Sequence, residues 1–324
     1  MTVSSLSCRT QQTPSPHLLR YSWAVLAYFI AVILWGTLVR ATGAGAGCGN
    51  HWPLCNGTVL QHTASVNTLV EFTHRITSGL SLLAVLGLML WTWTATERGH
   101  LARAASVAAV AFTVMEAILG ALLVALGLTA QSLSPLRPWF LALHLTNTLL
   151  LLAVLALTAH LLSRKTGYCR KTVRLVAPWG ALLGILVVMA VGVTGSLAAL
   201  GDTLFPASSL AGALSQDFAQ DLTSPAGWLV RWRWTHPVIA VIASAFLVWL
   251  LLRAVRGEGK KTHRGLSALV VALLASVYLL GLLDAALLAP VWAQVAHLLA
   301  ADSLWVALVV LTAQLTLKPA GEQQ

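Results

Sequence analysis

The chain has 324 residues, of which 58% are hydrophobic and only 9% are charged, and its mean hydropathy is +0.81. This composition excludes an ordinary soluble domain and is typical of a polytopic membrane protein. The net charge of +10 would fit a nucleic-acid partner, but the basic residues gather at alternate ends of the apolar runs, which indicates membrane topology instead.

Uncharged runs predict eight transmembrane helices, because a spanning helix needs roughly 20 mostly apolar residues. The runs cover about 21–40, 68–94, 104–128, 137–162, 175–198, 231–253, 265–287 and 291–316. The first is too long for a cleaved signal peptide, so we expect it to be retained as a span after a short polar tail. The predicted fold is an all-α bundle surrounded by membrane lipid.

Fifteen of the 20 Lys and Arg residues lie before the first run, after the last, or between runs two and three, four and five, and six and seven. The positive-inside rule then predicts that both termini are cytoplasmic. Short tails and compact loops favour a multi-pass protein of a bacterial plasma membrane. No region has the pattern of a nucleic-acid site.

The first external loop contains the stretch CGNHWPLC, Cys48 to Cys55. External thiols meet an oxidising compartment, which favours a Cys48–Cys55 disulfide. The alternative is a zinc site formed by both cysteines and His51, although a fourth ligand is not evident. The other two cysteines, Cys8 and Cys169, fall in predicted cytoplasmic segments.

Three segment pairs indicate an internal duplication. VRATGA at Val39 resembles VGVTGS at Val191, FTHRITSGLSLLAVL at Phe72 resembles WTHPVIAVIASAFLV at Trp234, and the helix of His144 resembles that of His297. We therefore predict two tandem four-helix units, 21–163 and 175–317, joined by a basic linker at 164–174 and flanked by tails at 1–20 and 318–324. A pseudo-two-fold axis along the membrane normal would relate them.

Four of the ten histidines belong to the repeated segments: His74, His144, His236 and His297. Each lies about two turns from the external end of its predicted helix, so the imidazoles share one depth. Histidines from two facing helices commonly hold a haem iron axially, which predicts two porphyrin sites, His74 with His144 and His236 with His297. Helix–helix hydrogen bonds and a single four-histidine metal centre are the alternatives.

Five basic residues break the positive-inside pattern: Arg40, Arg75, Arg137, Arg231 and Arg233. Arg75 follows His74, and Arg233 precedes His236 by three residues. We expect these two arginines to bind outward-facing porphyrin propionates, because a guanidinium suits carboxylates. The alternative is that these arginines extend to lipid headgroups.

The two predicted units differ in chemistry. Glu71 precedes His74 by three residues, and the equivalent position before His236 is Arg233. A carboxylate beside a porphyrin can accept a proton or stabilise a developing cation, so we expect the first unit to hold the reaction site. The alternative for Glu71 is a structural ion pair with Arg75 or Arg40. Glu116, Asp284 and Asp302 receive no role.

The stretches LVRATGAGAGCGNHWPLCNG and EFTHR, the later histidine-bearing spans and the duplicated eight-helix plan resemble the haem A synthase family (CtaA/Cox15). The resemblance covers nearly the whole chain. It departs from the family at Ala199–Pro206, which is expected to open the external loop of the second unit, where some relatives carry a second cysteine pair.

The resemblance implies an oxidoreductase that converts the C8 methyl group of haem O to a formyl group by successive hydroxylations. Glu71, His74 and His144 would serve the substrate site, and His236 and His297 would ligate a haem b. Cys48 and Cys55 would form the external disulfide of the family. The implied partners are a haem O synthase and haem-copper oxidase assembly factors. A di-haem b-type, quinol-linked electron-transfer subunit and a haem transporter are the alternatives.

Overall fold

The computed structural model describes residues 15–58, 65–163, 173–175, 179–219, 225–256 and 264–319. Most of the predicted linker 164–174, most of the N-terminal tail and residues 320–324 lie outside the described residues. Cys8 and Cys169 also lie outside them.

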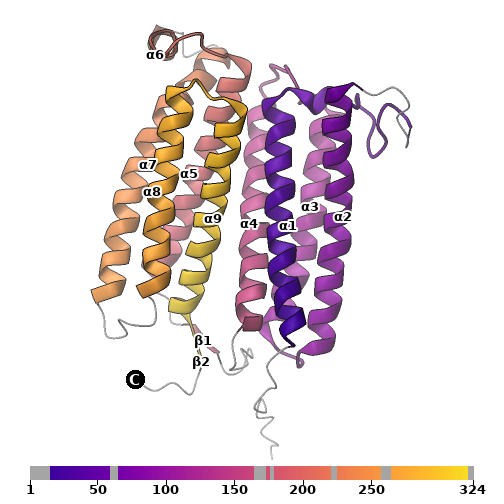
Figure 1. Ribbon diagram of the computed structural model, residues 1–324, viewed down its shortest axis with the longest axis vertical. Helices are drawn as coiled ribbons and strands as arrows, with labels where there is room; N and C mark the ends of the chain where they lie inside the picture. The colour runs from indigo at the N-terminus through magenta and orange to yellow at the C-terminus, as the bar shows by residue number, and fades with distance from the viewer. Residues whose placement is uncertain are drawn as a thin grey trace, which may run out of the picture.

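Eight of the described helices are long and apolar enough to cross a membrane, which confirms the predicted all-α, multi-pass membrane fold. Their axes are nearly aligned, and they form two adjacent groups (Figure 1). They are α1 (Pro16–Ala41), α2 (Val66–Ala95), α3 (Leu101–Ala125), α4 (Arg137–Ser163), α5 (Trp179–Leu204), α7 (Pro225–Arg256), α8 (Arg264–Ala286) and α9 (Val291–Thr316).

Three short features join the helices. A 3₁₀ turn η1 (Ala44–Ala46) follows α1, and α6 (Leu210–Ala219) lies between α5 and α7. Strands β1 (Val173–Leu175) and β2 (Leu317–Pro319) pair antiparallel, and they join the chain before α5 to the chain after α9. The disulfide loop after α1 and helix α6 lie at the opposite end of the bundle from these strands (Figure 1).

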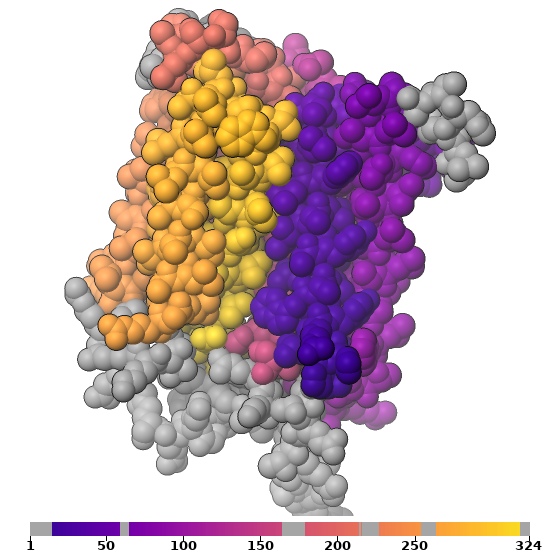
Figure 2. Space-filling model, viewed as in Figure 1, coloured from indigo at the N-terminus to yellow at the C-terminus, as the bar shows by residue number. Residues whose placement is uncertain are grey.

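Helices α1 to α4 pack on one another, as do α5, α7, α8 and α9. The two groups meet where α1 and α4 contact α5 and α9, and α9 lies beside α1 on the face shown in Figure 2. Fully buried leucines of α4 form much of the core, and the indole of Trp305 on α9 donates to the carbonyl of Leu149 on α4 at 2.7 Å. The pseudo-two-fold axis and the unit boundaries stay predictions.

Several helix boundaries differ from those that the sequence predicts, most clearly at α1, which begins at Pro16, and at α5 and α7. Helix α5 begins at Trp179 and runs to Leu204, so residues Ala199–Leu204 belong to the helix and do not open a loop. Helix α7 begins at Pro225 instead of 231, because proline is well suited to the first helical position. The charged residues that hid these ends pair with each other, with Arg233 Nε 2.8 Å from Asp202 Oδ1.

Candidate functional site

The four histidines lie on four different helices, α2, α4, α7 and α9, and each is half-buried. Each ring lies against a glycine of a neighbouring helix. An added Cβ would stand 3.0 Å from the ring Cε1 at three of these glycines and 3.9 Å at the fourth. The pairs are His74 with Gly36, His236 with Gly195, His297 with Gly281, and His144 with Gly120. Because these four glycines have no side chain, each imidazole can lie directly against the neighbouring helix.

His74 and His144 lie on α2 and α4 of one helix group, and His236 and His297 lie on α7 and α9 of the other. The pairing within each group stays a prediction. Within the described residues, no group of three or more His, Cys, Asp or Glu side chains could hold a metal ion. The alternatives of a single four-histidine centre and a zinc site at the first loop therefore find no support in this part of the chain.

The residues present fit a porphyrin held between two imidazoles. One histidine comes from each of two helices, and glycines open the space beside the rings. The Nδ1 atoms of His74 and His144 are buried and make no hydrogen bond to the described residues. Neither Nδ1 atom fixes the ring through a hydrogen bond, so the fit to a porphyrin rests on the placement of the histidines on two helices.

His236 has a ring orientation that a hydrogen bond fixes. The Thr194 hydroxyl on α5 lies 2.9 Å from Nδ1 of His236, and the same hydroxyl donates its single hydrogen to the carbonyl of Val191 at 2.8 Å. The threonine oxygen must therefore accept, and the hydrogen between them belongs to Nδ1 of the imidazole. Nε2 of His236 is then left with a lone pair, which is the form that binds a metal.

His144 has a different neighbour. Nε2 of His144 lies 3.4 Å from Oε1 of Glu116 on α3. Asn147 of α4 donates to this carboxylate and to the carbonyl of Phe112 at 2.9 Å. The Thr148 hydroxyl lies within hydrogen-bonding distance of the carboxylate and of the His144 carbonyl. Glu116 is thus fixed beside the ring by two side chains of the helix that carries His144. The sequence assigned Glu116 no role, because its partners are far away along the chain.

The first external loop is closed by a disulfide between Cys48 and Cys55, as predicted. The carboxylate of Glu71, which is 3% exposed, accepts from the backbone N–H of Cys48 at 2.8 Å. Its other oxygen lies 2.5 Å from Arg75, whose guanidinium also donates to the carbonyls of His51 and Leu54. Glu71 and Arg75 together hold the disulfide loop on the external end of α2.

Arg233 plays a similar part in the second half of the chain. It pairs with Asp202 and donates to the carbonyls of Gly201 and Phe205 at the end of α5. The predicted propionate ligands Arg75 and Arg233 therefore both bind protein carbonyls and a carboxylate. Guanidinium groups have five N–H donors, so other acceptors can still bind.

A third arginine joins the two helix groups. Arg40 on α1 donates to the carbonyl of Ala199 at 2.8 Å and to the hydroxyl of Thr203 at 2.7 Å, both on α5. Its other nitrogen donates to Gln294 on α9 at 2.8 Å. The sequence noted Arg40 as an exception to the positive-inside rule and as an alternative partner of Glu71. It did not reveal the observed partners, because contacts over 150 residues apart leave no local pattern.

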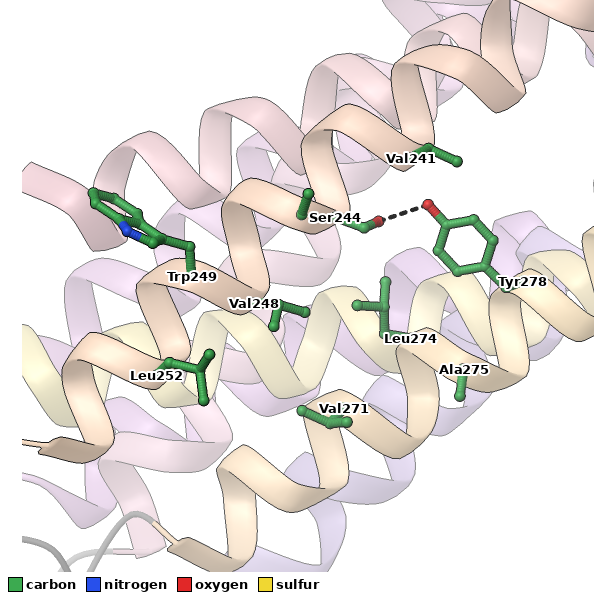
Figure 3. A pocket seen from close by; sticks show the side chains of 10 residues that line it. Val241, Ser244, Val248, Trp249, Leu252, Val271, Leu274, Ala275 and Tyr278 are labelled. Atoms are coloured by element: carbon green, nitrogen blue, oxygen red, sulfur yellow. Dashed lines mark hydrogen bonds between the residues drawn. The ribbon is translucent and has the colours of Figure 1, made fainter.

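A separate apolar groove of about 720 Å³ lies between α7 and α8. Figure 3 shows Val241, Val248 and Leu274 on its walls, with the Tyr278 hydroxyl bonded to Ser244 at 2.9 Å. The lining includes none of the four histidines. We therefore assign the groove no part in the site.

Contacts correct one of the sequence repeats. The repeat aligned Thr42 with Thr194, but Thr42 caps the end of α1 and bonds only to the carbonyl of Leu38, whereas Thr194 lies inside α5 and faces His236. The glycine that faces the first-half histidine is Gly36. Seven residues separate Gly36 from Gly43, the residue that the repeat aligned with Gly195. Two helical turns span this distance, so the short motif matched a similar helix face at the wrong depth.

The family described as COX15-CtaA, cytochrome oxidase assembly protein, matches residues 19–309. A Thermus thermophilus protein named protohaem IX farnesyltransferase is 42% identical over 291 residues, which are 90% of this chain and 47% of that protein. The chain thus spans about half the length of this relative.

Two shorter matches are to proteins named haem A synthase. The protein from Alkalihalophilus pseudofirmus is 40% identical over 92 residues, covering 28% of this chain and 31% of the relative. The protein from Listeria welshimeri is 32% identical over 140 residues, covering 42% and 43%. The family match extends over nearly all of the eight-helix bundle. The chain therefore belongs to the COX15-CtaA family of cytochrome oxidase assembly proteins.

Proposed function

We propose that the chain is a haem A synthase, an oxidoreductase that converts the C8 methyl group of haem O to a formyl group by successive hydroxylations. One observation carries the proposal: two glycine-bordered histidine pairs with unequal surroundings lie in a chain of this family. The relatives named haem A synthase support it. The farnesyltransferase name belongs to a protein more than twice as long as the matched region, so that name is not carried over.

Each pair receives a separate haem. His74 and His144, in the unit 21–163, would hold the substrate haem O, and His236 and His297, in the unit 175–317, would hold a resident haem b. The haem irons would supply the redox chemistry. The Thr194 hydrogen bond supports the resident role of the second pair, because hydrogen-bonded histidines are the usual permanent metal ligands.

Glu71 and Arg75 act on this site through the disulfide loop. Their contacts to Cys48, His51 and Leu54 support a role in holding the loop over the first histidine pair. Glu71 was predicted to be catalytic, and its present contacts favour the structural alternative weighed beside that prediction. The binding of propionates by Arg75 and Arg233 stays a prediction.

Location and partners follow from the same features. A disulfide at one end and most basic residues at the other support a bacterial plasma-membrane protein with both termini cytoplasmic. A farnesyltransferase would supply haem O, which the name of the Thermus relative supports. Haem-copper oxidase assembly factors would receive the product, as the family description suggests.

Extraction and mass analysis of the haems from cells that co-express this chain with a haem O synthase would test the proposal. We expect haem A only when the chain is present. Haem B and unmodified haem O alone, with the purified protein still binding haem, would instead support a di-haem electron-transfer subunit. The comparison should be repeated in a host with its own haem A synthase deleted and a functional respiratory chain, so that redox partners are present.

A further inference from the structure

Glu116 lies beside His144 of the first histidine pair, and the proposed reaction gives it no role. Its side chain is 23% exposed, and its carboxylate contacts Asn147 and Thr148, which are 6% and 4% exposed. It lies 3.4 Å from Nε2 of His144, the ring nitrogen that ordinarily binds iron. A carboxylate accepts hydrogen bonds and does not donate them when ionised.

The second half lacks this carboxylate. Glu116 stands four residues before Gly120, the glycine that faces His144, and the residue four positions before Gly281 is Val277. Gly281 faces His297 in the same way. The two pairs therefore differ at matched positions on matched helices, with an acid beside the first ring and an aliphatic side chain at the equivalent place in the second.

We propose that Glu116 is a positioning residue that makes His144 the releasable ligand of the substrate haem. When Nε2 binds iron, the ring hydrogen resides on Nδ1, which has no hydrogen-bond partner among the described residues. With no iron bound at Nε2, the tautomer that carries its hydrogen on Nε2 would donate to the carboxylate of Glu116, 3.4 Å away. This second tautomer has no lone pair for iron at Nε2, so the carboxylate favours an open coordination position.

The inference rests on the proposed function, since it needs a haem between His74 and His144. It also addresses a chemical requirement of that function. If two histidines bind an iron throughout the reaction, no position is left for another ligand. His236 gives the opposite case, because the threonine bond holds it in the tautomer that keeps Nε2 available.

Carbon monoxide titration of the reduced, haem-loaded full chain would test the inference, because carbon monoxide binds only where a ligand leaves the iron. Glu116→Val installs the residue found at the matched place in the second half. We expect carbon monoxide affinity at the first haem to fall by about tenfold or more, as the loss of a hydrogen bond to a charged group implies. Glu116→Gln keeps a neutral acceptor of the same shape, so we expect a smaller fall.

Repeating the Glu116→Val substitution in a His144→Ala variant tests whether Glu116 acts through His144 or affects the whole haem site. There the position is already open, and Glu116→Val should leave carbon monoxide affinity unchanged. An equal fall in both backgrounds, or no fall in the wild-type background, would overturn the inference. Failure of the chain to bind a haem through His74 and His144 at all would overturn the proposed function and this inference together. If the chain still forms haem A and Glu116→Val does not change carbon monoxide affinity, the inference alone would be overturned.

Discussion

The two histidine pairs of this protein differ in what surrounds rings of the same type. In the second half, Thr194 fixes His236 in the tautomer that leaves Nε2 free. In the first half, His144 faces the carboxylate of Glu116 through Nε2 itself. The comparison teaches that histidines of one chain can differ in chemistry because single hydrogen-bonding neighbours set which ring nitrogen carries the hydrogen.

The external ends show a second contrast. An arginine on α2 and an arginine on α7 each pair with a carboxylate and donate to carbonyls, which lie beyond α1 for Arg75 and at the end of α5 for Arg233. The carboxylate of the first half, Glu71, is buried and bonded to the disulfide loop, whereas Asp202 of the second half has a side chain 30% exposed. The first loop is therefore fixed more strongly than the second.

We expect the largest effect, a loss of unfolding free energy, when the buried Glu71 is replaced. Glu71→Ala leaves the Arg75 charge and the Cys48 N–H without their acceptor, and breaking a buried pair typically costs about 3–5 kcal/mol of unfolding free energy. Asp202→Ala removes a partly exposed pair and should cost about 1 kcal/mol or less. Thermal or denaturant unfolding in detergent micelles would measure both. Equal losses of unfolding free energy for Glu71→Ala and Asp202→Ala would show that the greater burial of Glu71 does not strengthen its ion pair.

An intermediate effect is expected at the glycines. Gly195→Val places atoms within about 3 Å of the His236 ring, and overpacking of this kind costs about 1–3 kcal/mol, so haem b occupancy should fall about fivefold or more. Gly36→Val should instead lower occupancy of the first site and spare haem b. Gly79→Val is the matched helical control, because an added Cβ there meets nothing within 4 Å. Haem content per protein, measured after extraction, would decide, and a loss in the control as large as that for Gly195→Val would refute the comparison.

The smallest effect is expected at the hydroxyl beside His236. Thr194→Val keeps the shape and removes one hydrogen bond worth about 1 kcal/mol, so haem b affinity should fall about fivefold. Thr42→Val, at the position that the sequence repeat matches to Thr194, should leave haem b affinity unchanged, since its hydroxyl bonds only to Leu38 in the described structure. Competitive haem transfer to an apo-acceptor would measure the affinity. The reverse result would favour the sequence alignment over the contacts.

Much of the fold could be predicted from the sequence, for a clear physical reason. A membrane requires long apolar helices, so hydropathy alone predicts the eight spans, and compartment chemistry predicts the Cys48–Cys55 disulfide. The four histidines were found because polar residues are rare and costly in spans. The ends of α5 and α7 were predicted less well, because Asp202 and Arg233 read as loop residues until their ion pair is seen.

The sequence by itself determined the class of fold, the number of spans and the Cys48–Cys55 disulfide, and it predicted the pairing of four histidines by duplication. Those features depend on composition, spacing and repetition, which are properties of one chain read in order. Only the tertiary structure decided which glycines border the rings, that Thr194 fixes His236, that Glu116 faces His144 and that Glu71 holds the loop. Each of these depends on the rotation and depth at which two helices meet, and packing sets both.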